Sequence, residues 1–389
     1  MSSYLMDTYN RYPISFSSGE GSWLFDEDGK KYLDYAAGIA VNILGHNHPK
    51  LNDALSKSIN NIWHVSNLYS IAQQDELAKK LCNISFAEKV FFCNSGAEAV
   101  EGAIKTARRY HYAMGDKERN EIITFEGSFH GRTLATIAAS LNEKHVEGFD
   151  PLPDGFKKIT IDKSDLEENV SNKTAAILIE PIQGEGGVNV VSKDFLSFVR
   201  EICDKNGILM ILDEVQCGLG RTGKLFAYEW SDITPDIIAI AKALGAGLPI
   251  GAVLSTKEAA EGMTHGVHGS TFGGNPLCSS IASKVLDLIK EENILSNVAS
   301  LSEYLISGIS KIIKEHHNKI SSVRGHGFMI GIKCKSENTV IANEALKNGL
   351  LLVTAADNVI RVLPPLNTNQ NEIDEFLKLL SITLENLSD

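Results

Sequence analysis

Apolar residues along the chain gather in short runs that are separated by longer amphipathic segments. The clearest runs are Val90–Cys93, Ile122–Phe125, Ala175–Ile179, Ile208–Leu212 and Ile237–Ile240. They are nearly continuous rather than alternating, which is typical of strands covered on both faces in a parallel sheet. Helical periodicity marks the segments between them, such as Ala97–Tyr112 and Asp194–Asn206. The pattern predicts an α/β fold with a mainly parallel sheet and helices on both of its faces.

The two ends of the chain show a different pattern. Short strands are expected at Trp23–Phe25 and Lys31–Tyr35, on either side of a turn at Glu27–Gly29. Beyond about residue 275 a long helical stretch runs through His317, and it is followed by strand-like segments and a terminal helix around Gly327–Lys333, Val359–Val362 and Glu372–Asn386. We therefore expect a large domain over residues 49–274 and a smaller α+β domain over 275–389, which the N-terminal segment 1–48 joins.

One apolar stretch, Ile237–Leu254, contains a single charged residue, Lys242. A membrane span is disfavoured, because a central charge costs roughly 2.5–3.5 kcal/mol there and glycines and a proline interrupt the helix. The pattern predicts a buried strand, a turn that carries Lys242, and a second strand. Apolar surroundings would lower the pKa of the amine and make its nucleophilic neutral form available. The alternative is a surface lysine whose stem follows apolar groups.

Composition narrows the class of protein. The chain has 389 residues, of which 43% are hydrophobic and 22% charged, as in an ordinary globular protein. A net charge of −12 argues against nucleic acid as a partner. The cysteines are scattered without CxxC spacing, which favours free thiols in a reducing compartment over disulfides or zinc. The N-terminus lacks the features of a secretory signal, so we expect a cytoplasmic protein that does not bind membranes.

Unusual residues follow two of the predicted strands, at the edge where ligands bind in open α/β sheets. Ser95 and Gly96 follow Val90–Cys93 and begin a helix, whose free N–H groups suit a phosphate. The alternative is a plain helix cap. A loop with two glycines follows Ile122–Phe125 and carries Phe129 and Arg132, a ring and a guanidinium suited to a cleft that binds a carboxylate.

Acidic residues follow two further strands. Glu180 and Glu185 come after Ala175–Ile179, either as a catalytic pair or as one neutralised acid beside a structural one. Asp213 comes after Ile208–Leu212, and a carboxylate at the end of a buried strand must be paired.

Three further motifs are ambiguous. Gly218–Lys224 matches a dinucleotide fingerprint and a phosphate loop, but no helix opens there, and Leu225 stands where the phosphate loop needs Ser or Thr. His46 and His48 lack a third metal ligand, so we expect a turn rather than a metal site. The loop from His268 to Asn275 suits either an anion or close packing.

A phosphate cradle, an aromatic ring, a buried aspartate and a desolvated lysine together fit pyridoxal phosphate better than any other cofactor. Its aldehyde condenses with a lysine amine, while a carboxylate keeps the pyridine nitrogen protonated so that the ring accepts electrons.

The same residues resemble a known family, the class III, fold-type I aminotransferases that depend on pyridoxal phosphate. The likeness runs from Gly38 to Arg361 and is greatest to the acetylornithine aminotransferases of arginine biosynthesis. Six motifs stand in the family's order: NSGAEAVEGAIKTAR, FHGRT, EPIQGEGG, LDEVQCGLGRTGK, AKALGAGLPIGA and HGSTFGGNP. The resemblance implies an α/β fold with a mainly parallel large-domain sheet and a smaller α+β domain.

The resemblance also implies roles for individual residues. Lys242 would bind the cofactor as a Schiff base and move the proton, and Asp213 would pair with the pyridine nitrogen. Further cofactor contacts are implied for Gln216 at the ring hydroxyl, Val215 and Phe129 on the ring faces, Ser95, Gly96 and Ala97 at the phosphate, and Thr271 at the phosphate of the neighbouring subunit. A homodimer with active sites at its interface is therefore implied.

The implied substrates are N2-acetyl-L-ornithine and 2-oxoglutarate, which give N-acetyl-L-glutamate 5-semialdehyde and L-glutamate. Arg132 would bind the α-carboxylate of the donor, with Ser270 also among the substrate-binding residues. Arg361 would bind the second carboxylate of 2-oxoglutarate and be masked by Glu185 otherwise. Ile39 would leave the uncharged acetyl end of the donor in apolar surroundings.

Other functions stay open. Ornithine δ-aminotransferases usually carry a tyrosine near the position of Ile39, yet Tyr12 resembles a segment where those enzymes contact substrate. Succinylornithine, succinyldiaminopimelate and 4-aminobutyrate are further candidate donors. A nucleotide-dependent enzyme built on Gly218–Lys224 is a rival class. A non-catalytic relative is another, although such a protein would have lost Lys242 or Asp213.

Overall fold

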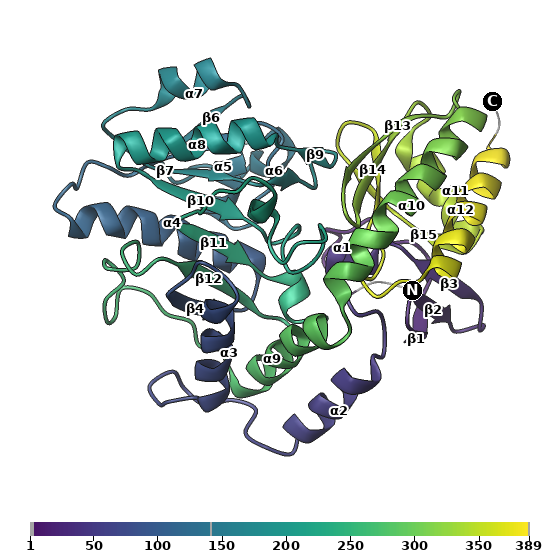
Figure 1. The fold of residues 1–389 in the computed structure, drawn as a ribbon, viewed down its shortest axis with the longest axis horizontal. Coiled ribbons are helices and arrows are strands. Elements are labelled where there is room, and N and C mark those ends of the chain that lie inside the picture. The colour runs from purple at the N-terminus through teal and green to yellow at the C-terminus, as the bar shows by residue number, and fades with distance from the viewer. Residues whose placement is uncertain (1–3, 141, 388–389) are drawn as a thin grey trace.

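The computed structural model describes residues 4–140 and 142–387. Figure 1 shows a large body, built on a seven-stranded sheet, beside a small body built on two four-stranded sheets. The large sheet has the order β4 (Lys89–Cys93), β12 (Gly251–Ser255), β11 (Ile237–Ile240), β10 (Leu209–Asp213), β7 (Thr174–Ile179), β5 (Glu121–Phe125) and β6 (Phe156–Ile159). All five apolar runs singled out in the sequence are strands of this sheet, and the predicted fold class is confirmed.

The large sheet is mainly parallel, with one reversed strand. Strands β11, β10, β7, β5 and β6 run parallel to one another, whereas β12 is antiparallel to both β11 and β4. The chain leaves β11, passes through the short 3-10 helix η2 (Lys242–Leu244) and returns as β12. The predicted strand, lysine-bearing turn and second strand are confirmed.

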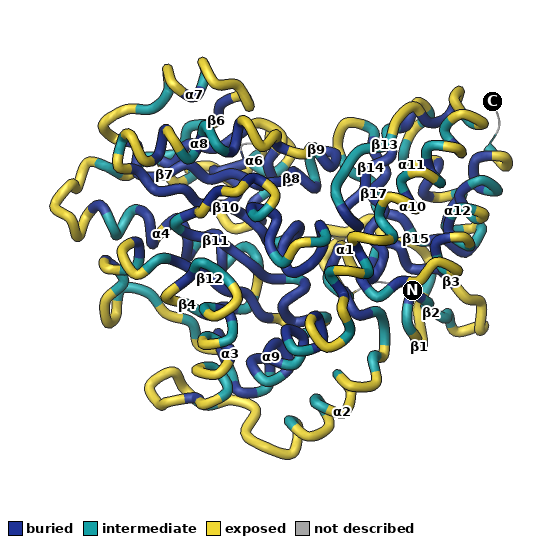
Figure 2. The backbone as a smooth tube through the Cα atoms, viewed as in Figure 1, coloured by how far each residue is buried: buried dark blue, intermediate teal, exposed yellow. Residues whose placement is uncertain are grey.

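Burial on both faces explains why these strands appear as continuous apolar runs. In β10, Leu209 and Ile211 belong to the apolar cluster that includes the inner face of α4 (Gly96–Ala113). Met210 and Leu212 point the other way, into the cluster that includes α8 (Lys193–Asn206). Figure 2 shows the sheet strands as buried backbone between the more exposed helices. At 20–33 cal/mol per Å², apolar burial of this kind is the main driving force for the fold.

The small body combines both ends of the chain. Its first sheet has the order β1 (Phe16–Glu20), β2 (Trp23–Asp26), β3 (Lys31–Asp34) and β15 (Leu350–Leu351). Its second has the order β13 (Ile320–His326), β14 (Met329–Cys334), β17 (Val359–Val362) and β16 (Val353–Ala355). Leu33 of β3 pairs in parallel with Leu350 of β15, so the N-terminal strands do join the C-terminal part.

The helical stretch expected from residue 275 to His317 is two helices, α9 (Pro276–Glu291) and α10 (Ile294–Glu315). They are separated at Asn293, which has a left-handed φ of 52°. Helix α9 packs against α2 (Pro49–Ser58) and α3 (Ala72–Asn83) of the large body. A domain division near Asn293 therefore fits the packing better than one at residue 274, and the division itself stays a proposal.

The remaining elements complete the two bodies and their connections. They are α1 (Ala37–Ala40), α5 (Leu134–Ser140), α6 (Glu143–Val146), α7 (Lys163–Asn169), β8 (Ile182–Gln183), β9 (Asn189–Val190), the 3-10 helix η1 (Ala227–Trp230), α11 (Asn338–Lys347) and α12 (Gln370–Glu385).

Candidate active site

A cavity of about 380 Å³ opens where the strands of the large sheet end. Its walls come from the segments that follow β4, β5, β7, β10 and β11. The lining includes nine residues singled out in the sequence, Ser95, Gly96, Ala97, Phe129, Glu180, Asp213, Val215, Gln216 and Lys242, together with His130. The sheet therefore brings together side chains that are far apart in the sequence.

The start of α4 forms one end of the cavity. Ser95 is the N-cap, and its Oγ accepts the N–H of Glu98 at 3.2 Å. The N–H groups at the start of this long helix are directed toward its N-terminal end, where the helix dipole favours an anion. A Cβ at Gly96 would lie 2.6 Å from Cγ1 of Val215, so glycine is needed where these two walls meet. The cap and the anion-site interpretations are compatible.

Asp213 is held from two sides at the end of β10. Its Oδ2 lies 2.8 Å from Nδ1 of His130, and its Oδ1 accepts the N–H of Val215 at 3.0 Å. Both side chains of the Asp213–His130 pair are almost fully buried. This is the partner that a buried carboxylate requires. His130 is not among the residues predicted from the sequence, although its position after β5 places it at the same edge of the sheet as Asp213.

Burial shifts the pKa values of Glu180 and Lys242 in opposite directions, and each shift favours the neutral form of the side chain. Burial, and then the charge of Asp213, raise the pKa of Glu180 well above its usual range. Its Oε2 accepts the N–H of Phe129 at 2.9 Å. Burial also lowers the pKa of Lys242 to about 8, and the charge of Arg361 lowers it further, whereas the charge of Glu185 raises it. A nucleophilic free amine is therefore accessible near neutral pH, and the surface-lysine alternative is wrong.

Arg361 and Glu185 meet beside the cavity. Nη1 of Arg361 donates to Oε1 of Glu185 at 2.6 Å and to Oε1 of Gln216 at 3.1 Å. Since Gln216 lines the cavity, this contact connects the ion pair to it. Because the Gln216 oxygen faces Arg361, its Nε2 is the atom left to donate to a bound group.

The loop around Glu185 is glycine-rich for packing rather than for mobility. A Cβ at Gly184 would collide with Oε1 of Gln216, and one at Gly186 with the carbonyl oxygen of Gly127. The carbonyl of Glu185 accepts the N–H of Ala356 at 2.9 Å.

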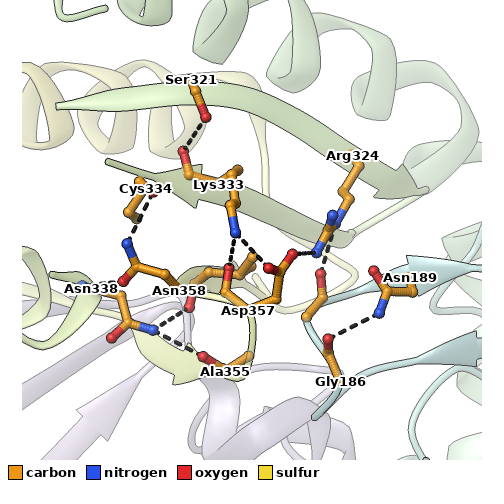
Figure 3. Close-up of polar contacts among 12 residues, drawn as sticks. Gly186, Asn189, Ser321, Arg324, Lys333, Cys334, Asn338, Ala355, Asp357 and Asn358 are labelled. Carbon is orange, nitrogen blue, oxygen red and sulfur yellow. Dashed lines mark hydrogen bonds and ion pairs between the residues drawn. The ribbon is translucent and has the colours of Figure 1, made fainter. Parts of the chain in front are cut away.

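Side chains of the small body and of β9 fix the same loop, as Figure 3 shows. Nε of Arg324 donates to the carbonyl of Gly187 at 2.8 Å, and its Nη2 donates to Asp357 at 2.9 Å. Nδ2 of Asn189 donates to the carbonyl of Gly186 at 2.9 Å. Movement of the Glu185 carboxylate would therefore be a side-chain rotation on a fixed backbone.

Besides Glu185 and Arg361, four residues expected to bind substrate or cofactor lie outside the lining of this cavity. Arg132 is exposed, with its guanidinium carbon 5.6 Å from the centre of the Phe129 ring. Ile39 is 37% exposed, and Thr271 is exposed. Ser270 lies next to the phosphate end, where its Oγ lies 3.2 Å from Nδ2 of Asn94, which lines the cavity.

The structure disfavours the two competing motifs. In Gly218–Lys224, Arg221 is buried and donates to the carbonyls of Phe328 and Pro364, so the segment is a packed connection between the two bodies. His46 and His48 contact different carboxylates, Asp34 and Glu292. Within residues 4–140 and 142–387, no helix has the length and apolar character needed to cross a membrane.

A sheet covered on both faces, with a lysine amine, a paired buried aspartate and a helix N-terminus around one cavity, is the arrangement that the aminotransferase resemblance predicts. The chain belongs to the class-III aminotransferases, whose family model matches residues 4–384. Membership implies pyridoxal phosphate as the cofactor, and the anion-suited helix start, the neutralisable lysine and the carboxylate of Asp213 fit its phosphate, aldehyde and pyridine nitrogen.

The chain is similar to named members of this family over nearly its full length. It is 51% identical to the acetylornithine aminotransferase of Brucella melitensis, covering 99% of this chain and 96% of that one. A solved N-acetylornithine aminotransferase from Stenotrophomonas maltophilia has 38% identity and a TM-score of 0.85, with 97% of each chain covered. A solved ornithine aminotransferase from Toxoplasma gondii has 29% identity and a TM-score of 0.95, covering 98% of this chain and 92% of that one.

Proposed function

We propose that the protein transfers the δ-amino group of N2-acetyl-L-ornithine to 2-oxoglutarate, as a step of arginine biosynthesis. The products would be N-acetyl-L-glutamate 5-semialdehyde and L-glutamate. The observation that carries this choice of donor is the 51% identity to the acetylornithine aminotransferase of Brucella melitensis across 99% of the chain. The scattered free thiols agree with a cytoplasmic location, which we also propose.

When bound, pyridoxal phosphate supplies an aldehyde and an electron-accepting ring. The N-terminal turn of α4, with Ser95, Gly96 and Ala97, would hold its phosphate. Asp213, oriented by His130, would hold a proton at the pyridine nitrogen.

The rest of the cavity would hold the ring and move the proton. Val215 and Phe129 would cover the two faces of the ring, and Nε2 of Gln216 would donate to its hydroxyl oxygen. Lys242, whose pKa is about 8, would take the proton from the substrate carbon and return it.

Two arginines would recognise the substrates' carboxylates. Arg132 is exposed beside the Phe129 ring and would bind the α-carboxylate of the donor. Arg361 would bind the second carboxylate of 2-oxoglutarate after the carboxylate of Glu185 rotates away. Ile39 and Ser270 would complete the substrate site at its rim.

We further propose a homodimer in which Thr271 reaches the phosphate bound by the neighbouring subunit. In one chain, Thr271 is exposed and lies outside the cavity lining. Its neighbour Phe272 is 59% exposed, with its ring centre 5.1 Å from that of His64. Trp63, Leu68 and Tyr69 are also exposed, so this region presents an apolar surface of the kind that a partner covers.

Ornithine δ-aminotransferase activity is the second candidate. The higher TM-score with the Toxoplasma gondii ornithine aminotransferase favours it. Tyr12 and Thr354 line a separate cavity. The carbonyl of Thr354 accepts a hydrogen bond from Nη2 of Arg361. The N-terminal segment therefore lies close to the proposed carboxylate site.

A donor panel distinguishes the two functions. Purified protein should be yellow, and borohydride should bleach that colour if Lys242 holds the cofactor. With 2-oxoglutarate as acceptor, N-acetylornithine should have a kcat/KM at least about tenfold above that of ornithine, or ~1.4 kcal/mol. The reverse order would assign the protein to the ornithine enzymes and make Tyr12 the next residue to test. A colourless protein without transaminase activity would reject both.

A further inference from the structure

A second cavity, of about 320 Å³, lies beside the C-terminal half of α4. Helix α4 lies on the side of the large body that is away from the small body (Figure 1). Five cationic side chains line it, Lys105, Arg108, Arg109, Lys117 and Arg119, together with Tyr112, Asn120, Met263 and Val267. None of these residues has a part in the proposed transamination.

Positive charge in this cavity is poorly compensated. Among the described residues, Arg119 is the one cation of the five that forms an ion pair, with Asp116 at 3.0 Å. Nζ of Lys105 lies 2.8 Å from Nδ1 of His268. Burial, and then the charge of Lys105, lower the pKa of His268, so the histidine is neutral and leaves the ammonium charge in place. This concentration of cations stands in a chain with a net charge of −12.

Backbone carbonyls orient the arginines without neutralising them. Arg108 donates through Nε to Asn120 at 2.9 Å and through Nη2 to Asp154 at 3.0 Å and Gly155 at 3.2 Å. Arg109 donates through Nε to the carbonyl of Gly262 at 3.1 Å. Because these guanidinium groups are already held in place, little side-chain conformational entropy would be lost when an anion binds.

The ring of Tyr112 contacts two of the five cations, Arg109 and Lys117. The guanidinium carbon of Arg109 and the ammonium of Lys117 lie 4.8 and 5.2 Å from the centre of its ring. An anion bound in the cavity would compensate positive charge that the described side chains leave unpaired. Met263 and Val267 add an apolar wall, so the cavity offers contacts to a carbon skeleton as well as to charges.

We propose that this cavity binds a small polyanion, a molecule with two or more phosphate or carboxylate groups. Arginine and lysine bind both kinds of group through charge-assisted hydrogen bonds, and arginine can do so with two parallel bonds. A volume of about 320 Å³ is at the lower end of small-molecule sites, which suits a small anion. The proposal does not depend on which amine the enzyme uses.

The test uses the holoenzyme, so that the cofactor's own phosphate occupies the helix start. Pyrophosphate, ADP and citrate are added separately, and the melting temperature and calorimetric Kd are measured at low and high salt. The two phosphate probes and citrate distinguish the two sources of negative charge. At least one of the three should raise the melting temperature and bind more weakly at high salt.

The decisive variant is the double substitution Arg109→Gln and Lys117→Gln, with Lys311→Gln and Lys314→Gln as its control. The control makes the same charge change at exposed positions of α10. Kd should rise at least about tenfold in the cavity variant and stay within about twofold in the control. Equal affinity in the two double variants, or no binding by any probe, would overturn the proposal.

A fold control separates loss of binding from loss of structure. The cavity variant should keep the yellow colour and a melting temperature close to that of the unmodified protein without added anion. If it does not fold, Lys117→Gln alone replaces it, because the ammonium of Lys117 makes no hydrogen bond within the described part of the chain. That variant should weaken binding about threefold, and an unchanged Kd would reject the site.

Discussion

The guanidinium of Arg361 is 1% exposed, whereas the carboxylate of Glu185 that it binds at 2.6 Å is 33% exposed. The two residues are 176 positions apart in the chain. A buried cation that loses its partner is costly, so Arg361 must have an anion beside it at nearly all times. Because the acid is the exposed member, a substrate carboxylate can replace it while the arginine stays in place.

Glu185→Ala should change donor selectivity. Without the acid, Arg361 is available to any dicarboxylate, so activity toward glutamate as amino donor should rise relative to N-acetylornithine. We expect the ratio of the two kcat/KM values to shift at least about tenfold toward glutamate, or ~1.4 kcal/mol. Single-turnover kinetics of each half-reaction measures this shift.

Two variants complete the selectivity experiment. Glu168→Ala removes an exposed acid of α7 and should leave the ratio unchanged. Arg361→Ala should impair the 2-oxoglutarate half-reaction more than the donor half-reaction. Equal losses in both halves for Glu185→Ala and Arg361→Ala would show that the ion pair is structural.

Lys242→Ala should abolish turnover and the colour that borohydride bleaches. The fold should persist, because the side chain lies in a cavity rather than in the packed core. Its removal also abolishes the desolvation cost of a buried amine. Absorbance, activity and circular dichroism measure these three properties. Lys257→Ala, at an exposed position just after β12, is the matched control and should behave like the unmodified protein. Substantial transamination by the Lys242 variant would remove the lysine from the mechanism.

The buried pair Asp213–His130 should act as one unit. Asp213→Asn cannot hold the pyridine nitrogen protonated, so the activation barrier should rise by several kcal/mol. Each ~1.4 kcal/mol of added barrier lowers kcat tenfold. His130→Asn removes a charge-assisted hydrogen bond worth about 1.5–3 kcal/mol and should cost roughly ten- to a hundredfold. In the double variant, loss of the aspartate should leave little further effect for the histidine. Additive losses, or an Asp213→Asn enzyme within about threefold of the unmodified protein, would contradict this assignment.

Cofactor uptake by the apoenzyme should depend on pH through Lys242. Its pKa of about 8 means that the amine is mostly protonated below that pH and mostly free above it. Since the free amine attacks the aldehyde, the uptake rate should rise about tenfold per pH unit below the pKa and level off above it. Stopped-flow absorbance measures the rate, and Lys257→Ala should give the same profile. A rate that stays constant across this range would contradict a titrating lysine.

Local sequence patterns were sufficient to predict most strands of the large sheet. Strands such as β10 and β11 are apolar on both faces, so their runs are visible without knowledge of their neighbours. Strand β6, with sequence FKKI, is an edge strand with two lysines and was missed for that reason. Strand β15 has two residues and is defined by its pairing with β3, which no local pattern reports.

In the active site too, single residues could be predicted from the local sequence, whereas contacts between distant segments could not. Lys242, Asp213 and Ser95 follow buried strands and are conspicuous in sequence. The contact between His130 and Asp213 depends on the order β10, β7, β5, which only the assembled sheet supplies. The glycines around Glu185 are explained by close contacts of Gly184 with Gln216 and of Gly186 with Gly127, which no local pattern reports.

The pairing of β3 with β15 has a consequence for biosynthesis. Nζ of Lys30, just before β3, binds the carbonyl of Lys347, 317 positions later. At a translation rate of roughly 5–20 residues per second, the N-terminal strands wait about 15–60 s on the ribosome for that partner. Throughout this interval the first sheet has one edge open while the large body folds. The nascent chain, rather than the finished enzyme, is therefore the form most exposed to proteases and in most need of chaperones.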